Sequence, residues 1–349
     1  MHSNPALGVL LHAIGGLAAA SFYIPYSRVK NWEWESYWLV GGIMSWIIAP
    51  WILALLICPN IFQIFFSVPA TSLFWTYVFG VLWGIGGLTF GLSVRYLGLS
   101  LGYAIALGFC AAFGTMIPPL FQGKTANLFT TASGQVTVVG VAVCLVGIAV
   151  CGWAGIRKES ELAPDEKTAN IREFNFLKGL WVAVFAGIMS ACMAFAFAAG
   201  KPISDAAKDG GTPEMFVNLP VLIVALFGGF TTNLIWCLYL NKKNKTFSNY
   251  TKGRGASLGA NYFFAALAGL TWYLQFFFYS MGTTRMGAYD FSSWTIHMAF
   301  IIAFSNVWGL WFREWKGSSS KTIRTVGTGI AVLALSTIVV GIGNYLAKH

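Results

Sequence analysis

Residues 38–58 read WLVGGIMSWIIAPWILALLIC, a run of 21 residues without a charged side chain. About 20 apolar residues cross the hydrocarbon core of a bilayer when they are helical, so this stretch predicts a transmembrane helix. The short alternating strands of an outer-membrane barrel do not occur in the sequence. We therefore predict an all-α polytopic membrane protein with ten transmembrane helices, because nine further apolar stretches accompany the first, at residues 6–27, 74–96, 99–121, 136–155, 177–199, 215–240, 258–281, 288–312 and 325–346.

The composition excludes the other common classes of protein. Of the 349 residues, 57% are hydrophobic and 10% are charged, whereas about 25% of the residues of a soluble domain are charged. Aromatic residues make up 16%, and no charged heptads run through the chain, which excludes disorder and a coiled coil. The first stretch lacks a basic N-terminal region and contains His12, so we expect a retained helix rather than a signal peptide.

The cysteines indicate neither redox chemistry nor a metal site. They are scattered through apolar stretches without the paired spacing of metal ligands. We therefore expect the cysteines to pack as small apolar residues, and we predict no metal and no cofactor. The sequence also contains no phosphate loop, no HExxH motif and no nucleophile elbow, which leaves an enzyme with little support. The six cysteines are Cys58, Cys110, Cys144, Cys151, Cys192 and Cys237.

The net charge of +10 arises from basic residues in the turns between the apolar stretches. Most of the 22 Lys and Arg residues follow the first, third, fifth, seventh and ninth predicted helices. By the positive-inside rule these turns face the cytoplasm, which places both termini on the periplasmic side. Cytoplasmic basic turns explain the charge without a nucleic-acid partner, and the lipid bilayer is the expected surrounding.

A polar loop divides the predicted helices into two halves of five. Residues 157–176 form this cytoplasmic loop, and the halves are residues 1–156 and 177–349. The halves echo each other weakly, since LGLSLG at 97–102 resembles MGTTRMG at 281–287. An odd number of helices inverts the second half in the membrane, and inverted repeats with a midplane site are typical of alternating-access transporters.

Few ionisable residues fall inside the predicted helices, and those that do are functional candidates because burying a charge in hydrocarbon is costly. Eleven of the 12 acids lie in loops or at helix ends, whereas Asp290 opens the ninth helix; His12 and His297 lie inside the first and ninth helices. Asp290, Trp294 and His297 share one helix face. We predict proton coupling for Asp290, His297 and His12. The alternatives are an aspartate that complements the helix dipole and histidines satisfied by neighbouring helices.

The eighth predicted helix carries an aromatic face with one amide. Trp272, Gln275 and Tyr279 stand at positions i, i+3 and i+7, which places them on one face. Such a face suits a sugar, whose C–H faces stack on rings while its hydroxyls form hydrogen bonds. Lipid-facing aromatics are the alternative, but they leave Gln275 without a partner. We therefore predict Trp272, Gln275, Tyr279 and Trp294 as substrate-binding residues.

Three residues near helix ends are further candidates for substrate binding, and each has two interpretations. Tyr23 and Tyr26 lie about one turn from Arg28, either as an interfacial aromatic belt or as a gate. Arg95, at the end of the third predicted helix, either pairs with Asp290 or extends its charge to the membrane surface.

Several Trp-rich blocks resemble the L-rhamnose–proton symporter family of the drug/metabolite transporter superfamily, and they follow in order over nearly the whole chain. The similarity is weakest at residues 157–175 and 241–257. The blocks are Phe22-Tyr23-x-Pro25, Val29-Lys30-x-Trp32-x-Trp34-Glu35, Gly41-Gly42-Ile43-x-Ser45-Trp46-Ile47-Ile48-x-Pro50-Trp51, Trp83-Gly84-Ile85-Gly86, Arg95-Tyr96-Leu97-Gly98, Trp272-Tyr273-Leu274-Gln275-Phe276-Phe277-Phe278-Tyr279 and Tyr289-Asp290-x-x-Ser293-Trp294-x-x-His297-Met298.

The resemblance implies a ten-helix carrier of the bacterial inner membrane with two inverted five-helix halves. It implies uptake of the 6-deoxy sugar L-rhamnose, driven by the proton gradient, and it adds Trp83 to the candidate substrate-binding residues. The expected mechanism is alternating access, in which Asp290 takes a proton and His297 or His12 tunes or shares it.

The sequence departs from the family pattern in two places. Residues 87–90 read GLTF where an asparagine is expected, and residues 286–288 read MGA where the family carries a proline and a glutamine. A carrier of the same superfamily for another sugar or small metabolite is therefore the alternative. A membrane-embedded enzyme or a sugar sensor is the remote one.

Overall fold

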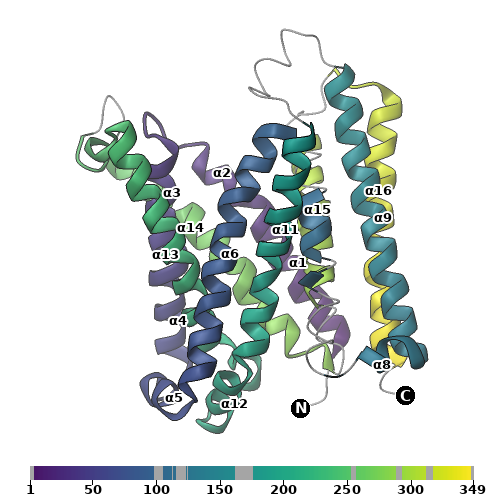
Figure 1. Cartoon of the computed structure of the whole chain (residues 1–349), viewed down its shortest axis with the longest axis horizontal. Coiled ribbons are helices and arrows are strands. Elements are labelled where there is room, and N and C mark those ends of the chain that lie inside the picture. Colours follow the sequence, from purple (N-terminus) through teal and green to yellow (C-terminus); the bar gives the residue numbers. More distant parts are fainter. Residues whose placement is uncertain are drawn as a thin grey trace. The chain divides into compact units, whose positions relative to one another are not determined.

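The computed structural model describes residues 4–97, 105–111, 113–114, 123, 125–161, 176–252, 257–287, 293–311 and 317–346. Helices joined by short turns make up these residues, with no strand among them (Figure 1). In chain order the elements are α1 (Pro5–Ser21), α2 (Tyr23–Tyr26), α3 (Trp34–Gly42), the π-helical turn η1 (Ile43–Ile48), α4 (Ala49–Ile57), α5 (Ile61–Ser67), α6 (Ala70–Leu97), α8 (Thr125–Thr130), α9 (Ala132–Glu161), α11 (Phe176–Ala199), α12 (Lys201–Asp209), η2 (Glu214–Phe216), α13 (Leu219–Asn244), η3 (Phe247–Tyr250), α14 (Leu258–Thr283), α15 (Ser293–Trp311) and α16 (Ser320–Leu346).

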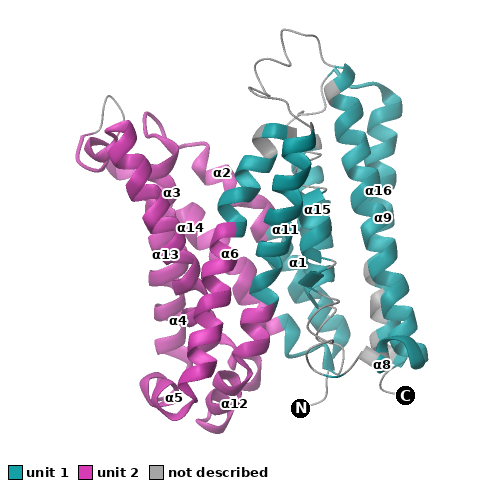
Figure 2. Cartoon of the chain, viewed as in Figure 1, with its two compact units in different colours: residues 1–17, 86–194, 282–349 teal, residues 18–85, 195–281 magenta. Residues whose placement is uncertain are grey.

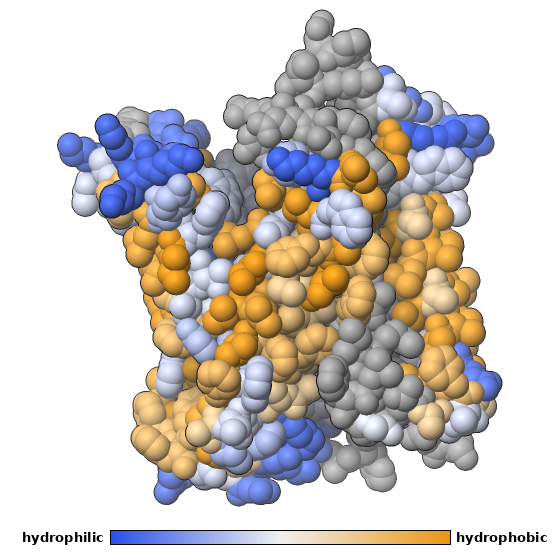
Figure 3. Space-filling model, viewed as in Figure 1, coloured by the Kyte–Doolittle hydropathy of each residue, from blue (hydrophilic) through white to orange (hydrophobic). Residues whose placement is uncertain are grey.

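Seven helical segments among the described residues are long and apolar enough to cross a membrane. They correspond to the first three and the fifth to eighth predicted helices, and α15 and α16 are two further long helices. The fourth predicted helix lies largely outside the described residues, so the count of ten stays a prediction. On the face in Figure 3, hydrophobic residues cover the middle of the helices and hydrophilic residues gather at their ends. The seven segments are Pro5–Tyr26, Trp34–Ile57, Ala70–Ser93, Ala132–Lys158, Leu177–Asp209, Glu214–Asn244 and Leu258–Thr283.

The chain forms two compact units (Figure 2). The boundaries between them fall inside α1, α6, α11 and α14, which are the first and third predicted helices of each sequence half. Each unit therefore takes helices from both halves, and the division into halves itself stays a prediction. Unit 1 comprises Met1–Leu17, Gly86–Ala194 and Gly282–His349, and unit 2 comprises Ala18–Ile85 and Phe195–Met281.

In unit 1, α9 and α16 lie side by side along their length (Figure 1). Small residues permit this approach, as expected for membrane helices. A Cβ atom added at Gly147 would lie 2.9 Å from the Leu333 side chain, and one at Gly329 would lie 2.5 Å from the sulfur of Cys151. Cys151 is buried and forms no disulfide, so it packs as a small residue in this contact.

The ends of α9 and α16 are joined by one carboxylate, Glu161. It accepts hydrogen bonds from the backbone N–H of Ser319 at 2.6 Å, the hydroxyl of Ser319 at 2.6 Å and the hydroxyl of Thr322 at 2.7 Å. Ser319 directly precedes α16, so the negative charge also complements the positive end of that helix. These hydrogen bonds hold the pKa of Glu161 below its ordinary value.

We expect Glu161→Gln to remove an acid-sensitive part of the stability of this connection. Because the pKa of Glu161 is lowered in the folded protein, its contribution is complete above the pKa of an unfolded glutamate, about 4.3, and is lost as the pH falls through the lowered value. Thermal unfolding in detergent should therefore show a larger difference between wild type and variant at pH 7 than at pH 3. A pH-independent difference would contradict this assignment.

Candidate functional site

Unit 2 contains a cluster of aromatic rings centred on Trp272 in α14. The Trp272 ring centroid lies 5.5 Å from that of Trp46, 5.5 Å from that of Trp83 and 5.0 Å from that of Phe276. Trp46 and Trp83 lie 6.3 Å apart with perpendicular planes. Two predicted substrate-binding residues, Trp272 and Trp83, are thus brought together, and Trp46 joins them.

Two local features of the sequence place Trp46 in this cluster. Trp46 lies in the π-helical turn η1, between α3 and α4. Pro50, at the start of α4, has no N–H to donate to a carbonyl one turn earlier, which favours a break in regular helix. Next to the turn, α3 and α14 approach closely, since a Cβ atom at Gly269 would overlap the backbone of Gly41. Only glycine permits this approach, which brings η1 against Trp272.

A cavity of about 10 Å³ borders the cluster at Trp46 and Trp272, whereas Trp83 and Phe276 do not line it. This is room for about one water, whereas pockets that hold small molecules measure about 300–1,000 Å³. The cavity is therefore too small, in this conformation, to hold a ligand of that size. Its lining includes Phe22, Tyr26, Trp38, Ser45, Trp46 and Trp272.

The two N-terminal tyrosines have different surroundings. Tyr26 is buried, its ring centroid lies 6.1 Å from that of Trp38, and the two rings are stacked. Tyr23 is 48% exposed. Only Tyr26 therefore belongs to the lining of the aromatic cavity, and an interfacial or gating role for Tyr23 stays a prediction.

The amide and phenol predicted on the aromatic face of α14 are both buried. Gln275 and Tyr279 are inaccessible to solvent over most of their surfaces, and the Tyr279 ring centroid lies 5.3 Å from that of Phe197. Trp272 and Gln275 follow each other on one face of the helix. Gln275 therefore lies inside unit 2, although it does not line the aromatic cavity.

Unit 1 contains the two predicted intramembrane histidines. His12 in α1 and His297 in α15 are fully buried, and their ring centroids lie 6.1 Å apart. The backbone of Gly282 packs against the His12 ring, since a Cβ atom added at Gly282 would lie 2.6 Å from Cε1 of His12. The structure thus brings together two of the three candidates for proton coupling.

Of the three remaining predicted residues of unit 1, only Trp294 has a side chain among the described residues. The indole N–H of Trp294 donates a hydrogen bond to the carbonyl of Cys110 at 3.1 Å, so Trp294 has a packing contact, and its predicted role in binding is untested. Asp290 lies outside the described residues, as does the side chain of Arg95. Their predicted roles stay predictions.

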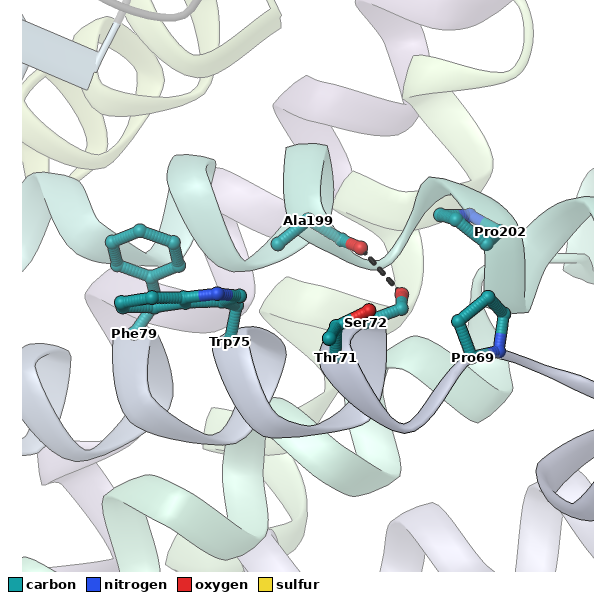
Figure 4. A pocket seen from close by; sticks show the side chains of 7 residues that line it. All are labelled: Pro69, Thr71, Ser72, Trp75, Phe79, Ala199 and Pro202. Carbon is teal, nitrogen blue, oxygen red and sulfur yellow. Dashed lines mark hydrogen bonds between the residues drawn. The ribbon is translucent and has the colours of Figure 1, made fainter.

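A larger cavity of about 450 Å³ lies elsewhere in unit 2 (Figure 4). It opens to the surface beside the start of α6, where the rings of Trp75 and Phe79 lie 5.8 Å apart. The hydroxyl of Ser72 donates a hydrogen bond to the carbonyl of Ala199 at 2.6 Å, so it is already used within the protein. None of the sequence-predicted residues lines this cavity, whereas Tyr26 and Trp272 line the smaller aromatic one.

Glu35, in the first turn of α3, is buried in unit 2 with 3% of its surface exposed. Its Oε1 accepts hydrogen bonds from the amide of Asn244 at 3.0 Å and the hydroxyl of Thr246 at 2.8 Å. Among the described residues, Glu35 is the only acidic residue that is buried. The sequence indicated only a position in a loop or at a helix end. The signal in the sequence that could have indicated its burial is its position next to Trp34, at the start of an apolar helix.

Comparison with known proteins gives a consistent result over the whole chain. The model of the family described as L-rhamnose-proton symport protein (RhaT) matches residues 1–346. A protein of Yersinia pestis (strain Pestoides F) named "L-rhamnose-proton symporter" is 38% identical over 346 residues, covering 98% of this chain and 99% of the relative. A protein of Cronobacter sakazakii (strain ATCC BAA-894) with the same name is 40% identical with the same coverage.

Proposed function

The chain belongs to the L-rhamnose-proton symport protein family, and from this premise we propose that it carries L-rhamnose together with a proton across the bacterial inner membrane. Membership of this family makes the protein a transporter rather than an enzyme. The observation that carries the proposal is the family match over residues 1–346, because it includes every described helix of both units.

The proposed architecture is ten transmembrane helices in two inverted halves. The unit boundaries support it, because they fall in the first and third predicted helices of both halves, as expected if the halves share one packing plan. The short helical segment at residues 105–111 lies where the fourth helix is predicted. Basic turns after the odd-numbered helices support periplasmic termini.

The aromatic cavity of unit 2 is the proposed sugar site. Trp46 and Trp272, which line the cavity, offer flat faces to the C–H groups of a pyranose. Trp83 packs behind them, 5.5 Å from Trp272 between ring centroids, and Gln275 offers an amide on the same face of α14 as Trp272. The cavity of about 10 Å³ fits a state in which no sugar is held. Alternating access widens it in another state that binds sugar more tightly, since a ligand shifts the population toward the state that it prefers.

The proposed proton carrier is Asp290, with His297 or His12 tuning or sharing the proton. Protonation removes the cost of burying a carboxylate charge, so the loaded carrier closes over the sugar and reopens toward the cytoplasm. Release of the proton there weakens sugar binding and resets the cycle. The proximity of the two buried imidazole rings, 6.1 Å between centroids, supports their joint role.

The test is a panel of sugars added to sealed vesicles that contain the purified protein. L-rhamnose should enter with protons, so the external pH should rise and labelled sugar should accumulate inside. We expect the apparent affinity of the protein for L-rhamnose to exceed its affinity for other sugars by about tenfold or more, which corresponds to about 1.4 kcal/mol of binding free energy. Vesicles without the protein provide the control.

The alternatives give different results in this assay. A carrier for another sugar or metabolite would show a pH change with that compound and none with L-rhamnose. A sensor would bind sugar without moving label across the membrane, and an enzyme would form product in detergent, where no gradient exists. Absence of any L-rhamnose response would overturn the proposed substrate.

A further inference from the structure

The π-helical turn η1 places two neighbouring polar side chains inside the aromatic cavity of unit 2. Ser45 and Trp46 line the cavity, with exposed fractions of 2% and 4%. No charged side chain is among the residues that line it in the described part of the chain. The polar groups of the lining residues are the Ser45 hydroxyl, the Tyr26 phenol and the indole N–H groups of Trp38, Trp46 and Trp272. The indole N–H of Trp38 donates to Oδ1 of Asn233 at 3.0 Å, so it is already used within the protein.

Two of these polar atoms are buried without a hydrogen-bond partner among the described residues. This holds for the Ser45 hydroxyl and for the Trp46 indole nitrogen. Among the other buried helical serines, Ser93 donates to the carbonyl of Phe90 at 2.7 Å and Ser336 to the carbonyl of Leu333 at 2.7 Å. Ser133 and Ser293 also lack a partner among the described residues, but they do not line this cavity. A buried polar atom without a partner lowers stability, and two adjacent ones in a cavity wall need an explanation.

The backbone of this segment also departs from a regular α-helix. Pro50 has no N–H, so it cannot donate to the carbonyl of Trp46 four residues earlier. π-helical turns occur frequently at functional sites, and this one lies against Trp272, 5.5 Å between ring centroids. The wall thus combines aromatic faces with an unused hydroxyl and an unused indole N–H, which is the chemistry that a polyol ring with apolar faces and hydroxyl edges requires.

We propose that Ser45 and Trp46 recognise hydroxyl groups of the transported sugar and determine which sugars are accepted. The Trp46 indole N–H donates to one sugar hydroxyl, and the Ser45 hydroxyl forms a hydrogen bond with another. The inference rests on the proposed function only in taking the occupant to be a sugar. A site built to bind a hydroxyl strongly rejects an analogue that lacks it, because the protein group is then buried without a partner.

The experiment measures L-rhamnose binding to the purified full-length protein by calorimetry. Trp46→Phe keeps an aromatic ring and removes the N–H, and Ser45→Ala removes the hydroxyl. Each variant should bind L-rhamnose about tenfold to a hundredfold more weakly, with unfolding temperatures close to that of wild type. Ser336→Ala, a buried helical serine of unit 1 that uses its hydroxyl within the protein, is the matched control and should bind within about twofold of wild type.

A second measurement begins with the unaltered protein. The monodeoxy analogues of L-rhamnose should include at least one that wild type binds more than tenfold more weakly, and Trp46→Phe or Ser45→Ala should lose that discrimination, as a coupled pair does. Equal binding of all monodeoxy analogues by wild type would overturn the proposal even if a variant fails to fold. Wild-type affinity in both variants would overturn it as well.

Failure of the proposed substrate gives a different pattern. If the vesicle assay shows that another sugar moves and L-rhamnose does not, the proposed function loses its substrate. The same comparison of wild type, Ser45→Ala and Trp46→Phe, made with that sugar and its deoxy analogues, then decides the role of the two residues.

Discussion

Asp290→Asn is expected to abolish accumulation of sugar against a gradient while sugar exchange across the membrane continues. The amide resembles the protonated carboxyl in shape and lacks its charge, so the variant stays in the form that closes over sugar. With one proton per sugar, a pH difference of one unit supports up to about tenfold accumulation in wild type. The variant should reach equal concentrations on both sides in proteoliposomes with an imposed pH gradient.

Glu35→Gln is the matched control for this experiment. Glu35 is a buried carboxylate in unit 2, and its Oε1 accepts hydrogen bonds from Asn244 and Thr246. We expect the variant to retain accumulation and to unfold at a lower temperature, since hydrogen bonds to a charged group contribute about 1.5–3 kcal/mol. If Glu35→Gln uncouples transport and Asp290→Asn does not, proton coupling belongs to Glu35, and the assignment of Asp290 is wrong.

The membrane helices could be predicted from the sequence because apolar length is a local property. The run at 38–58 corresponds to a helical segment that begins at Trp34 and ends at Ile57, and the face shared by Trp272 and Gln275 follows from helical spacing alone. Seven of the ten predicted crossings have counterparts among the described spans. The difference at Trp34 arises because polar Glu35 and Ser36 are buried by distant partners.

The contacts that make the site depend on residues far apart in the chain. Trp46, Trp83 and Trp272 come from three helices, and no spacing rule indicates that their rings meet. The burial of Glu35 depends on hydrogen bonds from Asn244 and Thr246, which are separated from it by 209 and 211 positions in the sequence. The sequence did not predict the π-helical turn, because the flanking residues Gly41, Gly42 and Pro50 are equally compatible with a simple kink.

Trp272→Ala should strongly weaken sugar binding, because the Trp272 ring lies at the centre of the aromatic cluster. Its centroid lies within 5.5 Å of those of Trp46, Trp83 and Phe276, so truncation removes the central stacking face. We expect binding to weaken by about 30-fold or more, the factor that corresponds to the 2 kcal/mol of a binding hot spot. Trp272→Phe should lose less, since it keeps a ring at the same place.

Trp75→Ala is the comparison that separates the two cavities of unit 2. Trp75 lines the larger cavity of about 450 Å³, is 50% exposed and comes from α6. If the aromatic cavity binds the sugar, Trp75→Ala should leave affinity and transport within about twofold of wild type, as expected for an exposed position away from the site. The opposite pattern, in which Trp75→Ala abolishes binding and Trp272→Ala preserves it, would place the sugar in the larger cavity. The small volume of the aromatic cavity would then reflect ordinary close packing, since protein interiors leave few voids larger than a water molecule.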